Sequence, residues 1–186
     1  MSVGDSPPRV DATGKVTGTA EYPADRIPAT ALHAKVVFTN QPHARLLRLD
    51  TARALQVPGV VAVFTGADVP VNEYGLTLFD QPVFISVDHT GRSAIPCDVS
   101  RWEADHLALV VAEDARAAEA GAVAIEADWE PLPVISDLDE ALADGAALVH
   151  PENGLPSNVY HSYRIRKGDM ATGWAEAAVV VESTYE

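Results

Sequence analysis

The sequence predicts an α+β fold, with a mixed sheet and short helices in one compact domain. Short strand patterns and short helix patterns mix along the chain, without a long series of strand–helix–strand repeats. Thirty alanines favour close packing of helices on a sheet. Hydrophobic residues make up 47% of the chain and the mean hydropathy is +0.02, which is typical of a globular domain with its own core.

The chain begins with an extended arm, because Pro7-Pro8 and the neighbouring residues show little hydrophobic pattern. The first strand is predicted over 31–39, with one side formed by Leu32, Ala34, Val36 and Phe38 and the other by His33 and Lys35. A second strand over 45–49 has a polar face that includes Arg48 and Asp50.

Asp50 is placed to cap a short helix over 51–56, which Pro58-Gly59 must end. The apolar run 60–65 then predicts a buried strand. Residues 66–100 carry many glycines and prolines and predict a long ordered loop, with one short strand at 83–87.

A further strand is predicted over 107–111. Asp114 follows as the N-cap of an alanine-rich helix that ends at Ala120, with Gly121 as its C-terminal cap. The next strand alternates, so Ile125 and Trp129 are expected to be buried. Its exposed face is acidic and consists of Glu126, Asp128 and Glu130. The strand ends at Pro131 and Pro133.

The last part of the chain is predicted to begin with an acidic helix over 137–144, which Gly145 stops. An ordered segment at 159–165 and a helical turn near 169–177 follow. Residues 179–185 alternate as a final strand with one apolar face. The open edge of such a strand is expected to cause weak self-association.

The net charge of −14 comes mainly from the second half of the chain. Thirteen acidic residues and one base, Arg116, lie between Glu103 and Glu152. This charge argues against nucleic acid and anionic membranes as partners. No apolar run has the length of a membrane span and the first residues do not resemble a secretory signal, so the expected location is the cytoplasm.

The residues predict no catalytic, cofactor-binding or metal-binding site in this chain. There is no glycine-rich phosphate loop, and the six histidines do not fall at metal-ligand spacings. A single cysteine, Cys97, excludes a zinc site built on several thiolates. The alternatives left open are a Cys97–His89 nucleophile pair, a carboxylate pair in 113–144, and histidines that converge in space.

Five short motifs, in order, resemble the first domain of the large, molybdenum-binding subunit of the xanthine dehydrogenase and aldehyde oxidase family. Residues 9–25, RVDATGKVTGTAEYPAD, are similar to the signature R-x-D-x-x-x-K-V-T-G-x-A-x-Y-x-x-D. Residues 40–45, NQPHAR, resemble S-P-x-A-H-A-x-I, and residues 58–70, PGVVAVFTGADVP, resemble P-G-V-x-A-V-x-T-x-x-D-x-P. Residues 107–113, LALVVAE, and 129–134, WEPLPV, resemble V-A-x-V-V-A-E and Y-E-P-L-P-x-V.

The resemblance implies the α/β-hammerhead fold. Its domain boundaries would be an arm and signature turn over 1–30, the hammerhead domain over 31–178, and a strand over 179–186 leading toward a molybdopterin-binding domain absent from this chain. The motif residues, expected to be structural, are Lys15, Gly18, Tyr22, Asp25, His43, Pro58, Gly59, Glu130 and Pro131. One departure is Ala104-Asp105-His106, where the family has Gly, an acidic or amide residue, and Pro.

The resemblance implies that the chain is the hammerhead domain of a molybdenum hydroxylase, either as a fragment or as a small subunit. The complete enzyme would oxidise an aldehyde or an N-heterocycle such as a purine. The domain would shape the cofactor and substrate channel without being active alone. The family's cofactor is molybdopterin, with iron–sulfur centres and FAD on other domains or subunits, and the expected partner is the molybdopterin-binding domain or subunit. The alternative is a stand-alone binding or assembly module with the same fold.

Overall fold

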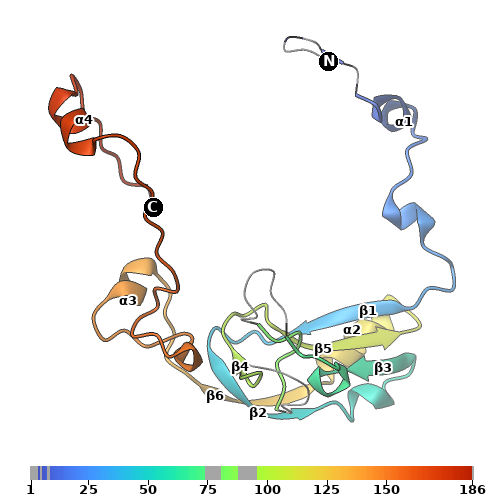
Figure 1. Ribbon diagram of the computed structural model, residues 1–186. Helices are drawn as coiled ribbons and strands as arrows, with labels where there is room; N and C mark the ends of the chain where they lie inside the picture. Colours follow the sequence, from blue (N-terminus) through green and yellow to red (C-terminus); the bar gives the residue numbers. More distant parts are fainter. Residues whose placement is uncertain (1–3, 5, 8, 74–80, 88–95, 186) are drawn as a thin grey trace. The chain divides into compact units, whose positions relative to one another are not determined.

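A computed structural model of the chain describes residues 4, 6–7, 9–73, 81–87 and 96–185 (Figure 1). The chain divides into two compact units, Met1–Val134 and Ile135–Glu186. This division differs from the predicted domain end at residue 178. Two three-stranded antiparallel sheets and the longest helix belong to the first unit, which confirms a mixed α and β fold with short helices.

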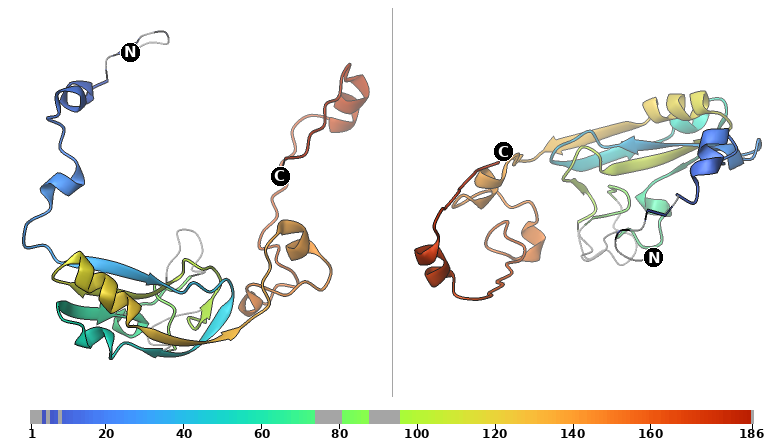
Figure 2. Two further views of the ribbon diagram at one scale, coloured as in Figure 1. Left: turned by 180° about the vertical axis from the view of Figure 1, so that it is seen from behind. Right: turned by 90° about the horizontal axis from the view of Figure 1, so that it is seen from above.

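The first sheet consists of β1 (His33–Phe38), β5 (His106–Ala112) and β3 (Val60–Phe64), with β5 in the centre. Helix α2 (Ala115–Val123) packs on one face of this sheet, as Figure 2 shows from behind. The predicted alternation of the first strand is confirmed, because Lys35 reaches Glu119 of α2 over 2.7 Å. The apolar residues Ala34, Val36 and Phe38 of β1 therefore lie on the other face.

Helix α2 begins as predicted and ends later than predicted. The Asp114 carboxylate accepts a hydrogen bond from the Ala117 N–H at 2.8 Å, which confirms the N-cap. Gly121 is not the C-terminal cap, because the helix continues to Val123. A Cβ on Gly121 would lie 2.8 Å from Val60 Cγ2 and 2.9 Å from Val110 Cγ1. The glycine is needed for close approach of the helix to the sheet, not for a left-handed turn.

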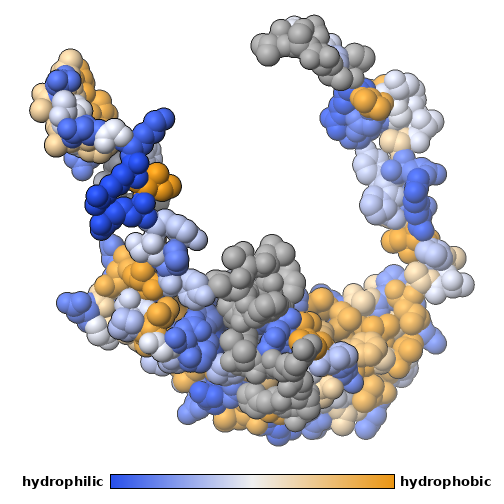
Figure 3. Space-filling model, viewed as in Figure 1, coloured by the Kyte–Doolittle hydropathy of each residue, from blue (hydrophilic) through white to orange (hydrophobic). Residues whose placement is uncertain are grey.

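The sheet face opposite α2 is apolar and uncovered by other described segments over much of its area. Figure 3 shows hydrophobic side chains gathered over β1, β5 and β3 on this side. The prediction that 60–65 is a buried strand is wrong, because Val61 and Phe64 are exposed. The reason is that β3 is an edge strand whose second face is not covered by any helix of the described residues.

The second sheet consists of β4 (Val99–Ser100), β2 (Ala44–Asp50) and β6 (Glu126–Pro131), with β2 in the centre. Leu46, Ile85 and Leu107 form a buried cluster that joins the two sheets. Ile125 and Trp129 pack against this cluster while Asp128 and Glu130 are exposed, so the predicted orientation of the strand is confirmed. Pro131 is the last residue of β6, where its missing N–H is tolerated.

The helix predicted over 51–56 is only a 3-10 turn, η2 (Ala54–Gln56). Asp50 accepts a hydrogen bond from the Ala52 N–H at 2.9 Å and so forms a local turn instead of capping a longer helix. Next to this turn, Arg48 pairs with Asp128 at 2.7 Å and with Asp50 at 3.1 Å. The hydrogen bond to Asp128 raises the pKa of Arg48, so its charge is held on the surface of β2 and β6.

The loop after β3 is held by a buried asparagine. After the turn η3 (Gly66–Asp68), Asn72 donates to the Phe84 carbonyl at 2.8 Å and accepts from the Phe84 N–H at 2.9 Å. Residues 83–87 do not form the predicted strand. They still make sheet-like bonds, from the Ile85 N–H to the His106 carbonyl at 2.7 Å and from the Ser86 N–H to the Cys97 carbonyl at 2.8 Å.

The N-terminal segment contains α1 (Ala12–Thr17) and the turn η1 (Pro23–Arg26), neither of which buries a residue. The second unit contains α3 (Leu138–Leu142), η4 (Pro151–Asn153) and α4 (Met170–Glu176). The strand predicted at the end of the chain is wrong for the described residues 179–185, because a strand needs a hydrogen-bonded neighbour and none pairs with them. In the described part of the chain, none of the helices has the length and apolar character needed to cross a membrane.

Replacing Gly121 by alanine is expected to lower the free energy of unfolding by about 1–3 kcal/mol, because the new methyl group overpacks the contact of α2 with Val60 and Val110. The matched control is Gly173→Ala within α4, where a Cβ meets no atom within 4 Å. Urea unfolding followed by near-ultraviolet circular dichroism checks both. An unchanged midpoint for Gly121→Ala would contradict the close approach.

Replacing Asn72 by aspartate is expected to destabilise the protein at pH 7 and less so near pH 4. The buried carboxylate would face the Phe84 carbonyl, so its pKa rises in the folded state. A raised carboxyl pKa means that stability falls as pH rises from the unfolded to the folded pKa. Thermal unfolding against pH checks this, with Asn153→Asp at an exposed site as the control. Equal pH dependence of the two variants would contradict it.

Candidate functional site

Two of the five sequence motifs, 40–45 and 129–134, meet at one end of the second sheet. Ala44, the first residue of β2, lies opposite Pro131 of β6 and opposite Ser100 of β4. Its side chain is 1% exposed. We use the name signature corner for residues 39–44, 98–106 and 130–133, which these strand pairings bring together.

His43, the residue before β2, contacts the backbone of the segment that follows β6. Its Nδ1 lies 2.5 Å from the Pro133 carbonyl oxygen, and the Leu132 N–H donates to the His43 carbonyl at 3.0 Å. Because a carbonyl oxygen only accepts, Nδ1 is the donor and carries the proton. The geometry is that of a histidine that orients the chain after β6.

The interior of the corner is a polar network of small side chains. The hydroxyl groups of Thr39 and Ser100 are both buried and lie 2.8 Å apart, and Ser100 also donates to the Gln41 carbonyl at 3.0 Å. Asn40 has a φ of 50°, and its N–H donates to the Glu103 carbonyl at 2.9 Å. These bonds satisfy backbone groups where β1 ends and the chain turns toward β2.

The departure from the family pattern at 104–106 has a local explanation. One carboxylate oxygen of Asp105 accepts hydrogen bonds from the backbone N–H groups of Arg101, at 2.8 Å, and Trp102, at 3.1 Å. The Asp105 N–H returns to the Trp102 carbonyl at 2.9 Å. The aspartate therefore closes the turn before β5 without a glycine.

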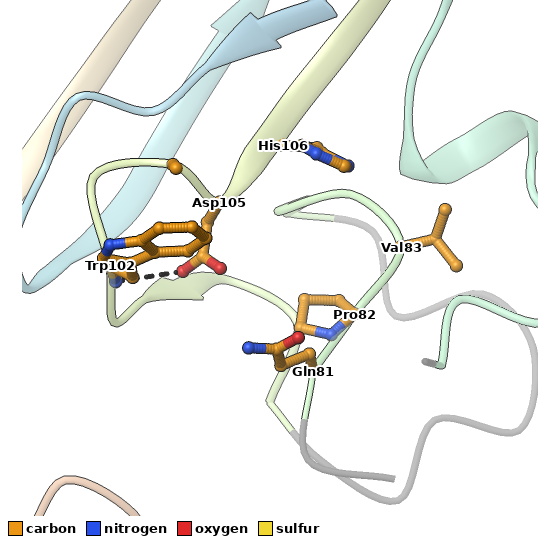
Figure 4. Close-up of a pocket in the computed structure, with 7 residues that line it drawn as sticks. Gln81, Pro82, Val83, Trp102, Asp105 and His106 are labelled. Carbon is orange, nitrogen blue, oxygen red and sulfur yellow. Dashed lines mark hydrogen bonds between the residues drawn. The ribbon is translucent and has the colours of Figure 1, made fainter. Parts of the chain in front are cut away.

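A cavity of about 470 Å³ lies beside this turn (Figure 4). The indole ring of Trp102 forms one wall and Pro82 lies across from it, with His106 at one end. Trp102 is 59% exposed, so its ring is available for contact. The residues that line the cavity are Gln81, Pro82, Val83, Trp102, Ala104, Asp105 and His106. This mostly apolar lining suits a flat or apolar group.

Glu130, the acidic motif residue of the signature corner, belongs to a group of ion pairs on the surface of the second sheet. Arg45 lies 2.5 Å from Asp98 and 3.6 Å from Glu130. Glu130 is exposed, and its distance from the arginine is that of a weak surface pair. The group joins β2 to β6 and to the residue before β4.

The remaining motif residues lie outside the signature corner and shape local turns. Lys15 pairs with Asp11 at 2.7 Å, and Gly18 ends α1 with a φ of 73°. The Arg9 side chain, and then Lys15, lower the pKa of Asp11. The Tyr22 N–H donates to the Asp25 carboxylate at 2.8 Å, so these two residues form a capping box at η1.

Pro58 and Gly59 form the turn before β3. Gly59 has a φ of 88°, and its carbonyl accepts from the Glu113 N–H at 2.8 Å. A Cβ there would lie 3.0 Å from the Ala117 Cβ of α2, so the turn fixes the distance between strand and helix. The structure thus unites His43, Glu130 and Pro131 and keeps the other motif residues apart from them.

Thr39 and Ser100 of the corner network were absent from the sequence predictions, and Asp105 was noted only as part of the departure from the family pattern. All three are small polar residues at strand ends, and sequence position alone does not distinguish them from surface residues. The sequence feature that could have indicated these residues is the run of polar residues at the end of each strand pattern, next to Gln41-Pro42 and before His106.

The described residues show neither a cluster of metal-binding side chains nor a phosphate-binding loop. Within the ranges that the structure describes, no group of three or more His, Cys, Asp or Glu side chains could hold a metal ion. Cys97 is buried, and His89, its suggested partner, lies outside the described residues. The glycines with positive φ in the described ranges stand apart from one another and build no phosphate-binding loop.

Comparison with known proteins identifies the fold family. The model of the "aldehyde oxidase and xanthine dehydrogenase, a/b hammerhead domain" matches residues 17–133. This match covers the signature corner and ends next to the division between the two compact units.

Curated relatives match nearly the whole chain. A probable xanthine dehydrogenase component of Bacillus subtilis is 34% identical over 96% of this chain and 22% of its own length. The aldehyde oxidoreductase of Megalodesulfovibrio gigas is 36% identical over 98% of this chain and 20% of its own length. The chain therefore spans about a fifth of the length of these relatives.

Solved structures agree with this assignment. The aldehyde oxidoreductase from Desulfovibrio gigas superimposes with a TM-score of 0.71 at 34% identity, over 92% of this chain and 19% of that one. Quinoline 2-oxidoreductase from Pseudomonas putida 86 gives a TM-score of 0.71 at 29% identity, over 96% of this chain and 22% of that one. The chain belongs to the aldehyde oxidase and xanthine dehydrogenase family, and its first unit is the a/b hammerhead domain of that family.

Proposed function

We propose that this chain is a non-catalytic part of a molybdenum hydroxylase that oxidises an aldehyde or an N-heterocycle such as a purine. It serves there as the hammerhead domain, covering part of the molybdopterin-binding domain or subunit and shaping the path of the substrate. Molybdopterin is bound by that partner, and iron–sulfur centres and FAD lie on other domains or subunits. The cytoplasm is the proposed location.

The observation that carries the proposal is the family match over the signature corner, together with the character of the corner itself. Its polar side chains bond to backbone groups of the same chain, and its histidine donates to a carbonyl. Such side chains position strands and the Trp102 cavity, and the chemistry is left to other parts of the enzyme. The names of the relatives, which include xanthine dehydrogenase, aldehyde oxidoreductase and quinoline 2-oxidoreductase, support the substrate class.

The weak self-association proposed from the sequence remains a prediction. The described residues 179–185 form no strand, although Val179, Val181 and Tyr185 are exposed. Any association through this segment therefore rests on its apolar side chains and not on a preformed strand edge.

We expect the isolated chain to contain no stoichiometric molybdenum and to oxidise neither purines nor aldehydes. The native protein, purified from its source through a tag on this chain, is expected to contain molybdenum and to show hydroxylase activity. Metal analysis and activity assays of the two preparations check this. Native material without molybdenum would contradict the proposal and favour a stand-alone binding module, and stoichiometric molybdenum in the isolated chain would contradict the non-catalytic role.

We expect Trp102→Ala in the native protein to raise the KM for an N-heterocyclic substrate by about 2-fold to 10-fold, the loss of one aromatic contact. The kcat is expected to change less, because a contact that holds the substrate equally in the bound state and in the transition state affects KM and not kcat. Steady-state kinetics check this, with Trp174→Ala as the control, since Trp174 is similarly exposed but lies in the second unit. An equal KM for both variants would contradict a role of the cavity in substrate access.

A further inference from the structure

The face of the first sheet opposite α2, which the described segments leave largely uncovered, is more apolar than a solvent-facing sheet surface needs to be. Val110 and Ala112 of β5 point toward α2, so Leu109 and Val111 point to the opposite side. The register places residues of both outer strands beside them on the same side. We call this set the open face; its members are Ala34, Val36, Phe38, Ala62, Phe64, His106, Leu109 and Val111.

All members of the open face except His106 are apolar. Phe38 and Phe64 are each 42% exposed. Leu109 and Val111 are half-buried although they lie on the central strand, with a hydrogen-bonded strand on either side. Residues 81–87 contact this face at one end, where Phe84 and Phe38 lie 6.4 Å and 5.6 Å from the His106 ring centre.

The sequence indicates that this face is built to be buried. The continuous apolar runs at 60–64 and 107–111 are typical of strands covered on both faces. On β1, Ala34, Val36 and Phe38 lie on the open face, and the charged Lys35 lies with Val37 on the side of α2. A sheet whose open face is exposed to water would carry polar residues on that face and apolar residues on the side of the helix.

A second copy of the chain is a poor match for the open face. Three strands about 4.8 Å apart, each with six residues rising about 3.3 Å, give a face of about 14 Å by 20 Å. Two such faces packed together bury about 600 Å², whereas specific complexes bury at least about 1,200 Å². Each copy also carries a net charge of −14, so the two copies repel each other.

We infer that the open face is the surface on which the molybdopterin-binding part of the enzyme packs, through an apolar surface of its own. The inference rests on the proposed function. In the Eubacterium barkeri nicotinate dehydrogenase, the large molybdopterin subunit matches 98% of this chain with 40% of its own length. A polypeptide of that kind brings further surface to the contact, which a second copy of this chain cannot.

The test places a photo-reactive benzoylphenylalanine at Phe64 of the tagged chain in the native protein. The control position is Val123, which is 78% exposed on α2, the helix that covers the opposite face. After irradiation and proteolysis, mass spectrometry identifies the peptide joined to each position. The expected result is a peptide of the molybdenum-containing polypeptide, from outside the residues of this chain, joined at Phe64 and not at Val123.

Three results would overturn the inference: a Phe64 cross-link to a second copy or to residues of this chain, no cross-link at Phe64, or equal cross-linking at both positions. Molybdenum analysis of the same material keeps the two proposals apart. Molybdenum present with any of these results overturns the inference alone, and its absence overturns the proposed function together with the inference.

A second measurement uses substitutions that add a charge to each surface. Phe64→Glu is expected to reduce the molybdenum recovered per tagged chain at least about tenfold, the loss of one buried aromatic contact. Val123→Glu is expected to leave the recovery within about twofold, as is usual for surface substitutions. Phe64→Leu, which keeps the apolar surface, is expected to restore the recovery. Failure of Phe64→Leu to restore it, in a chain with unchanged circular dichroism, would contradict apolar packing.

Discussion

Strand β5 is hydrogen-bonded along both edges, to β1 and to β3, and α2 packs so closely on it that Gly121 has no space for a Cβ beside Val110. This contact sets the position of the helix, and through the turn at Gly59 it sets the position of β3. The turn closed by Asp105 comes directly before β5, and the His106 carbonyl at the start of β5 accepts a hydrogen bond from the Ile85 N–H. The first sheet, the signature corner and the Trp102 cavity therefore share one central strand.

The elements that could be predicted from sequence are those whose cause is local. Asp114 caps α2 because its side chain reaches an N–H three residues later, and the alternation of 125–130 requires only that one strand face is buried. Gly121 was misassigned because the same residue type serves as a helix cap and as a close-contact residue, and only the packing partners distinguish the two. The end of the chain was misassigned because an alternating pattern becomes a strand only beside a second strand.

The candidate site was the part least accessible to sequence reasoning. His43, Glu130 and Pro131 were found through their motifs, but the partners that give them a position lie elsewhere in the chain. Thr39 and Ser100 are 61 residues apart, and the pairing of the start of β2 with β4 brings them within hydrogen-bond distance. Two motifs of this family thus meet where β2 pairs with β6, and the buried Ala44 lies between its neighbours in β4 and β6.

The apolar run of β3 and its exposure in the structure lead to one physical conclusion. Burial of apolar surface is the main force that stabilises a sheet, and α2 supplies it on one face only. The sequence nevertheless carries apolar residues on both faces of β3 and β5, and it places the charged residue of β1 toward the helix. The chain spans about a fifth of the length of its relatives, and we infer that such a face is covered by another part of a larger protein. The feature that is least favourable for this chain alone is therefore the one that best fits the proposed role.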